Sequence, residues 1–281
     1  MIKRSTALIV AGLMLMFGIA IGDQLLPRTS KDSVLPEVTE LIINEGYSIT
    51  QQQTLTNVAI DAMLRAAGDQ WGRYQRDAVA AQEPQVVTQT VSVTPLKRAA
   101  VIKISYFSVG TSKQVKQELA NLTNNQGVVL DLRDNNGGLL AEAVATASLF
   151  LEEELVTTVT SRADEPVTLY ADGSGKKNFS VVVLINAGTA SSAEIVASAL
   201  QDHGRAVVVG SRSFGKASVQ ETFELPDNSK LMLTVGRFIR PSGLEIDGLG
   251  VMPDVPVAAT GDPLKMAVNV AVGLNAAVSG K

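Results

Sequence analysis

The chain has 281 residues, of which 46% are hydrophobic and 19% are charged, a composition typical of a globular protein with one or two domains. Its net charge of −4 argues against a nucleic-acid partner, because the chain has no basic excess to offer to phosphates. The absence of cysteine excludes disulfides, zinc ribbons and a thiol nucleophile. The single histidine, His203, excludes a zinc site built from several histidines.

Residues 1–23 have the pattern of a targeting signal. Lys3 and Arg4 precede an apolar run from Ala7 to Ile21, and small residues stand near its end, as in secretory signals. The run is shorter than the roughly 20 apolar residues of a spanning helix, which favours a cleaved signal peptide, with an uncleaved membrane anchor as the alternative. Either way, the rest of the chain is expected outside the cytoplasm. It would lie in the periplasm or another extracytoplasmic space, tethered to the inner membrane if the segment is an anchor.

Residues 24–82 are expected to form a polar linker and a helical N-terminal region. Apolar residues have helical spacing over 38–45 and again over 54–66, and Gly68 suits the end of the second helix. Residues 75–90 are polar and rich in alanine and glutamine, which predicts a connector.

Residues 83–260 alternate between apolar strands and helices, which predicts an α/β core. Three of the strands are continuous apolar runs, of the kind that is buried on both faces. Residues 261–281 are expected to add a closing helix that Asp262 and Pro263 begin. The expected strands lie at 99–105, 127–132, 181–186 and 206–210, and the expected helices at 113–122, 142–151 and 193–200.

The first candidate functional stretch runs from Asp131 to Leu140, between a buried strand and a helix. Gly137 and Gly138 allow the backbone to approach a ligand closely and present N–H groups that can hold an oxyanion. The same glycines also suit a tight turn that only needs positive φ. This stretch alone leaves both interpretations open.

The second stretch centres on Ser191, which lies between a strand and a helix. Backbone donors and the helix dipole at a helix N-terminus favour developing negative charge, as a nucleophilic serine requires. Ser191 and Glu194 also form the spacing of a capping box, which is a purely structural role. Both roles remain open on this motif.

The third stretch contains Lys216. If residues 216–220 are extended, Lys216, Ser218 and Gln220 share one face. A lysine beside Phe214 and next to a buried sheet can be desolvated, and a neutral lysine is a competent base for a serine. Gln220 is then a candidate to orient its amine. The alternative is a surface lysine on an edge strand.

His203 and Asp202 are excluded as direct bases by distance. His203 follows Ser191 by 12 residues, and a continuous helix at about 1.5 Å per residue would separate them by about 18 Å. Both are expected at the end of that helix, where Gly204 provides the stop.

The three stretches together resemble the C-terminal processing peptidases, or tail-specific proteases, of peptidase family S41. That family carries the patterns LDLRxNxGG, GxASxxEI and FGKxxVQ, and this chain reads LDLRDNNGG, GTASSAEI and FGKASVQ in the same order. The resemblance spans about residues 90–260 and includes RPSGLEIDGLGVMPDV at 240–255, with a weaker helical match over 38–75. It implies a ClpP/crotonase-like α/β core with a helical N-terminal region, and neither a metal nor an organic cofactor.

Residue by residue, the resemblance implies that Ser191 is the nucleophile, Lys216 its base and Gln220 the partner that orients the base. It places the oxyanion hole at the backbone N–H groups of Gly137 and Ser191. The implied activity is a serine endopeptidase that cleaves exported proteins or peptides near their C-termini. The helical region before residue 75 is a candidate for self-association, and an adaptor protein is a further candidate partner.

The chain departs from the family pattern in one respect. Only 26 residues separate Tyr74 from Val101, whereas an independent domain needs about 50 or more. We therefore expect no PDZ domain, which leaves the capture of substrate C-termini unexplained. Two alternatives stay open. One is a non-catalytic binding or scaffold protein, and the other a crotonase-like enzyme acting on an acyl thioester, against which export argues.

Overall fold

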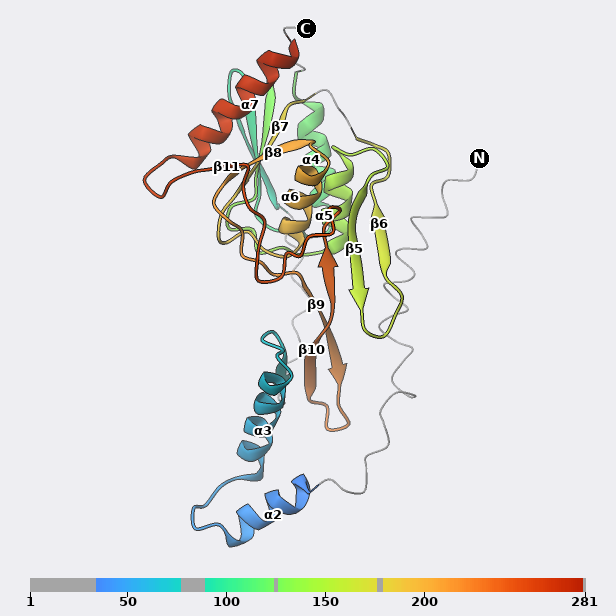
Figure 1. Cartoon of the computed structure of the whole chain (residues 1–281), viewed down its shortest axis with the longest axis vertical. Helices are drawn as coiled ribbons and strands as arrows, with labels where there is room; N and C mark the ends of the chain where they lie inside the picture. The colour runs from blue at the N-terminus through green and yellow to red at the C-terminus, as the bar shows by residue number, and fades with distance from the viewer. Residues whose placement is uncertain (1–33, 77–88, 124–125, 176–178, 280–281) are drawn as a thin grey trace, which may run out of the picture. The chain divides into compact units, whose positions relative to one another are not determined.

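The computed structural model describes residues 34–76, 89–123, 126–175 and 179–279 (Figure 1). It divides into two units, residues 1–63 and 64–281. The targeting signal expected at residues 1–23 lies outside the described residues. Within the described ranges, no helix combines the length and the apolar character that crossing a bilayer requires.

The first unit contains α2 (Leu35–Glu45) and most of α3 (Gln52–Ala66), so the predicted helical N-terminal region is present. A proline in the first turn of α2 suits a helix start, because the missing N–H has no intrahelical partner there. Beyond α3, Gly68 adopts φ +72° and donates its N–H to the carbonyl of Arg65 at 3.0 Å. The predicted stop at Gly68 is therefore correct.

The second unit is built on a six-stranded sheet in the order β11-β8-β7-β4-β3-β2. Neighbouring strands from β3 to β11 pair in parallel, and β2 pairs antiparallel with β3. All residues of β4 and β7 are buried, which explains why their sequences are apolar except for Asp131 at the end of β4, which pairs with Arg133. The strands are β2 (Val91–Pro95), β3 (Ala99–Ile104), β4 (Gly127–Asp131), β7 (Val181–Ile185), β8 (Ala206–Gly210) and β11 (Val255–Pro256).

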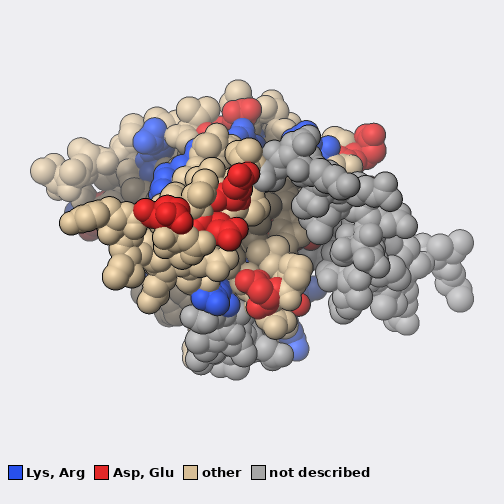
Figure 2. All heavy atoms as spheres, turned by 90° about the horizontal axis from the view of Figure 1, so that it is seen from below, with Lys and Arg blue, Asp and Glu red and all other residues tan. Residues whose placement is uncertain are grey.

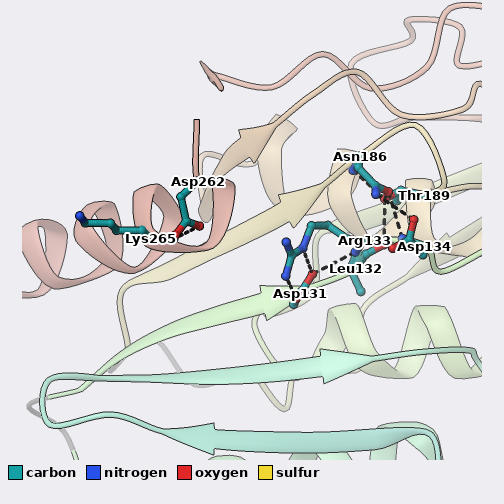
Figure 3. A network of polar contacts seen from close by, with 8 residues as sticks. All are labelled: Asp131, Leu132, Arg133, Asp134, Asn186, Thr189, Asp262 and Lys265. Carbon is teal, nitrogen blue, oxygen red and sulfur yellow. Dashed lines mark hydrogen bonds and ion pairs between the residues drawn. The ribbon is translucent and has the colours of Figure 1, made fainter. Parts of the chain in front are cut away.

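Helices cover both faces of this sheet (Figure 1). The larger apolar core joins one face to α4 (Thr111–Ala120), α5 (Leu140–Ser148) and α6 (Ser192–Asp202). The opposite face packs against α7 (Pro263–Ser279). Asp262 caps α7 by accepting the N–H of Lys265 at 3.0 Å, so the predicted start of the closing helix is correct (Figure 3).

A second, antiparallel sheet was not expected from the sequence. Its order is β1-β10-β5-β6, with β9 paired to β10. β9 begins two residues after Lys216, so this sheet carries the lysine segment. The strands are β1 (Arg73–Gln75), β5 (Leu155–Ser161), β6 (Val167–Tyr170), β9 (Ser218–Glu224) and β10 (Lys230–Ile239). Figure 2 shows a face on which acidic and basic side chains are interspersed among neutral ones.

Candidate active site

The three stretches singled out in the sequence meet at one edge of the parallel sheet. They follow β4, β7 and β8, which are neighbours and end at the same edge. The N–H of Ala190 donates to the carbonyl of Asn135 at 2.9 Å, and the N–H of Phe214 donates to the carbonyl of Thr189 at 2.9 Å. The fold therefore joins all three stretches directly.

Asp134 and Asn186 clasp the first two stretches together (Figure 3). The N–H of Asp134 donates to Asn186 Oδ1 at 3.0 Å, and Asn186 Nδ2 donates to Asp134 Oδ1 at 2.9 Å. A Cβ atom at Gly188 would stand 2.7 Å from Asp134 Oδ1, so the clasp needs glycine there. The Thr189 hydroxyl adds a bond of 2.8 Å to the carbonyl of Leu132. These contacts fix the loops that carry the site.

Ser191 stands at the N-terminus of α6 in a strained conformation. Its φ of 56° and ψ of −122° are rare for a residue with a side chain, and such strain is concentrated at functional sites. Its N–H donates to Glu194 Oε2 at 2.8 Å, so the predicted pairing of these two residues is present. Ser191 is thus the N-cap of α6, with a strained backbone, and the residue is partly exposed.

Gly137 lies directly against the serine. A Cβ atom on this glycine would stand 2.8 Å from Ser191 Cβ and 3.1 Å from the nitrogen of Ser192, and its φ is +107°. The N–H of Gly137 donates to Asn135 Oδ1 at 2.9 Å. The Ser192 hydroxyl donates to the carbonyl of Gly138 at 2.8 Å and holds this loop to α6. The close approach predicted for the paired glycines is therefore present.

The N–H of Ser192 is a feature that the sequence interpretation missed. Its nitrogen would stand 3.1 Å from a Cβ atom on Gly137, and the N–H donates to no protein acceptor within the described residues. The two N–H groups expected to form the oxyanion hole, at Gly137 and Ser191, donate to side-chain oxygens in this structure. The first N–H groups of a helix have no acceptor within the helix. Because Ser192 is the first residue of α6, this rule could have indicated its available N–H from the sequence.

Glu194 connects the serine to the lysine segment. Its carboxylate is fully buried and accepts four hydrogen bonds. Oε1 accepts the Ser213 hydroxyl at 2.5 Å and the N–H of Gly215 at 2.7 Å, while Oε2 accepts the N–H groups of Ser191 and Lys216 at 2.8 and 2.9 Å. Burial raises the pKa of Glu194 above its ordinary value, against the effect of these four donors.

Lys216 is partly buried, and its Nζ lies 5.0 Å from the ring centroid of Trp71. Gln220 Nε2 donates to the Ser218 hydroxyl at 2.7 Å and lies 3.5 Å from the Thr234 hydroxyl. Ser218 and Gln220 thus share a face, as predicted. The role of Gln220 in orienting Lys216 stays a prediction.

His203 and Asp202 lie at the far end of α6, as expected. The helix is continuous from Ser192 to Asp202, and His203 Nε2 contacts the carbonyl of Leu155 at 2.7 Å. Asp202 forms an ion pair with Arg240, whose Nη2 lies 2.5 Å from Oδ1. Across the described part of the chain, no group of three or more histidine, aspartate or glutamate side chains is arranged to hold a metal ion.

A cleft of about 430 Å³, which no sequence pattern predicts, borders the lysine segment. Residues 67–71, the end of β5, residues 234–237 of β10 and Ser218 line it. Trp71 forms part of this lining and also contacts Lys216. The cleft is therefore connected to the predicted base through the ring of Trp71.

Comparison with known sequences identifies relatives. The model of peptidase family S41 matches residues 98–257. A carboxyl-terminal-processing protease of Synechocystis is 36% identical over 185 residues, which cover 62% of this chain and 43% of that protein. Carboxyl-terminal-processing peptidase 2, chloroplastic, of Arabidopsis thaliana is 32% identical over 234 residues, which cover 76% of this chain and 45% of that protein. The match thus spans less than half the length of these curated relatives.

Solved structures give a consistent result. The photosystem II D1 C-terminal processing protease matches 66% of this chain and 53% of its own, with a TM-score of 0.57 and 29% identity. A lipoprotein from Streptococcus agalactiae matches 84% of this chain and 88% of its own, with a TM-score of 0.61, and at 18% identity this likeness concerns the fold alone. The chain belongs to peptidase family S41, with the mixed α/β fold of its proteases and a helical N-terminal region.

Proposed function

We propose that this protein is a serine endopeptidase of the C-terminal processing type that acts through Ser191 and Lys216. The observation that carries the proposal is that one buried carboxylate, that of Glu194, accepts the N–H groups of both residues. It fixes the strained serine and the segment of the lysine relative to each other. Gly137 lies against the same serine, where a carbonyl oxygen would develop charge.

The proposed reaction proceeds through an acyl-enzyme. Ser191 Oγ attacks the peptide carbonyl carbon while the neutral amine of Lys216 takes the hydroxyl proton. As the C–N bond breaks, the Lys216 ammonium returns this proton to the leaving amine. Water then attacks the ester with Lys216 as base, which releases the acid and restores Ser191. Gln220 is proposed to orient the amine.

The oxyanion of each tetrahedral intermediate is proposed to bind the N–H groups of Gly137 and Ser191. These groups donate to Asn135 and Glu194 in the present structure, so the substrate oxygen is proposed to share them with these side chains in three-centre hydrogen bonds. The N–H of Ser192 offers a third donor near Gly137, with no protein acceptor in the described part.

We further propose that the substrates are exported proteins or peptides, because residues 1–23 carry the pattern of a targeting signal. The boundaries given above for the linker, the catalytic core at 83–260 and the closing segment, and the absence of a PDZ domain, stay predictions. Membrane tethering through the N-terminus, self-association and an adaptor protein also stay predictions.

A non-catalytic scaffold is the alternative function. The observation that favours it is that protein oxygens occupy both predicted oxyanion donors. The two functions are separated by assaying the purified chain on an unstructured protein substrate, alongside Ser191→Ala and a Ser229→Ala control. The peptidase proposal expects cleavage by the wild type and by Ser229→Ala, and none by Ser191→Ala. Equal cleavage by Ser191→Ala would contradict it, and no cleavage by any variant would favour the scaffold.

A further inference from the structure

The ring of Trp71 lies against the lysine that we propose as the base. Lys216 Nζ stands 5.0 Å from the ring centroid, and the ring packs on Phe214 with centroids 5.9 Å apart and planes 50° apart. Nζ makes no hydrogen bond within the described residues, so the aromatic face is its contact. A cation at this distance is attracted to the π face, and most strongly by tryptophan.

Asp69 holds Trp71 in place. Asp69 Oδ1 accepts the N–H groups of Trp71 at 3.1 Å and Gly72 at 2.8 Å, which closes the turn. The same carboxylate accepts the N–H and the hydroxyl of Thr234 at 2.7 and 2.8 Å, from a position 165 residues later. Although burial raises the pKa of Asp69, the hydrogen bonds from Thr234, Trp71 and Gly72 outweigh it and hold the pKa below its ordinary value. The loop of residues 67–72 is thus fastened to β10.

The charged groups on the elements around Lys216 are already paired. Glu194 of α6 accepts four donors, including the N–H of Lys216 itself. Asp247 pairs with Arg237 at 3.7 Å and accepts the N–H of Ala217 at 3.4 Å. Asp69 accepts four donors, as described above. In the described structure, none of these carboxylates hydrogen-bonds to Nζ.

We infer that Trp71 is a positioning residue for Lys216 and that the loop of residues 67–72 belongs to the active site. The inference rests on the proposed function. The ring holds the amine in place near the cleft that Trp71 helps to line. The sequence places residues 67–72 in the expected helical N-terminal region, apart from the three stretches with catalytic candidates.

The test measures Lys216 itself and does not depend on turnover. The purified chain is acetylated with limiting acetic anhydride over a range of pH, and modification of Lys216 is quantified by peptide mass spectrometry. Lys265, an exposed lysine on α7, serves as the internal reference. Trp71→Leu removes the aromatic face and keeps apolar bulk. Trp71→Phe keeps an aromatic face and removes the indole Nε1, which is buried without a partner in the described part.

In Trp71→Leu, acetylation of Lys216 relative to Lys265 is expected to rise about threefold at each pH, because the ring no longer holds the amine. In Trp71→Phe the rise should be smaller, and Lys265 should not change. The kcat of Trp71→Leu should fall while its KM stays near the wild-type value, because the amine is no longer positioned. The unfolding temperatures of both variants are measured to verify that each is folded at the assay temperature.

Unchanged acetylation of Lys216 in folded Trp71→Leu would overturn the inference, as would an equal change at Lys265. The two proposals fail separately. Cleavage that survives in Ser191→Ala ends the peptidase proposal and leaves the acetylation result in force. Cleavage that depends on Ser191, together with unchanged acetylation of Lys216 in Trp71→Leu, ends only the role of Trp71.

Discussion

Glu194 Oε2 accepts the main-chain N–H of Lys216 at 2.9 Å, although the two residues lie 22 positions apart in the chain. The same oxygen accepts the N–H of Ser191 at 2.8 Å. An ionised carboxylate suits this place because it only accepts hydrogen bonds and has room for four. The backbones of the proposed nucleophile and base are therefore held by one side chain.

Glu194→Gln is expected to lower kcat about 100-fold, since a small displacement of reacting groups has an effect of this size. The amide has one acceptor oxygen and turns N–H donors toward groups that are themselves donors. Steady-state kinetics on a peptide substrate measures the change. Glu142→Gln is the matched control, because Glu142 also accepts two main-chain N–H groups, at Gly110 and Ser112. A Glu194→Gln enzyme with the kcat of the control would contradict this role.

Gly137→Ala is expected to lower kcat/KM by about 100- to 1,000-fold, the usual effect of losing one oxyanion donor. The added Cβ would stand 2.8 Å from Ser191 Cβ, so the loop has to move away from the serine. Gly204→Ala is the control, because Gly204 also has positive φ, +60°, but has open space where the Cβ would go. Similar kinetics for the two variants would contradict this prediction, because the approach of Gly137 to Ser191 would then have no effect beyond that of a side chain at positive φ.

Lys216→Arg separates charge from basicity. Arginine keeps a cation near Trp71 but cannot lose its proton in a protein. We expect cleavage to fall at least about 1,000-fold at every pH, with an unfolding free energy within about 1 kcal/mol of the wild type. Lys230→Arg, on the neighbouring strand β10, should keep full activity. Substantial cleavage by Lys216→Arg would remove Lys216 as the base.

Asp202→Asn tests the ion pair between Asp202 and Arg240 at the C-terminal end of α6. Burial raises the pKa of Asp202, but hydrogen bonds from Arg240 and Ser242 outweigh it and hold the pKa below the ordinary 3.8. A depressed pKa means that this stabilisation is present above pH 3.8 and is lost as the pH falls through the folded-state pKa. At pH 7 the variant should be about 3 kcal/mol less stable, because the buried guanidinium of Arg240 loses its carboxylate and keeps the amide oxygen of Gln201 as a charge-neutral partner.

Urea unfolding of wild type and Asp202→Asn at several pH values checks this prediction. The gap in unfolding free energy should be constant near neutrality and should narrow as the pH falls below about 4. A gap that widens toward acid, or no gap at pH 7, would contradict the assigned role of the ion pair.

The parallel core was predictable from the sequence because its signals are local. The apolar runs at 127–132, 181–186 and 206–210 end within one residue of β4, β7 and β8, since strands buried on both faces are built mainly from apolar residues. The sites at Gly137 and Ser191 stood out because each follows such a strand and precedes a helix.

The antiparallel sheet was not predictable in this way. β5 and β6 show no regular alternation of buried and exposed residues, and β5 pairs with β10, whose residues come about 80 positions later. Asp69 accepts hydrogen bonds from Thr234, which lies 165 positions later, and Glu194 accepts hydrogen bonds from donors 19 to 22 positions after it. A pattern within one segment contains no information on contacts of this kind.

The central claim is that Ser191 is the nucleophile, and covalent labelling tests it most directly. The purified chain is treated with a fluorophosphonate, and the modified residue is identified by peptide mass spectrometry in the wild type and in Ser191→Ala. The account predicts an adduct on Ser191 in the wild type and no adduct in the variant. An adduct on a different residue, or equal labelling of Ser191→Ala, would contradict it.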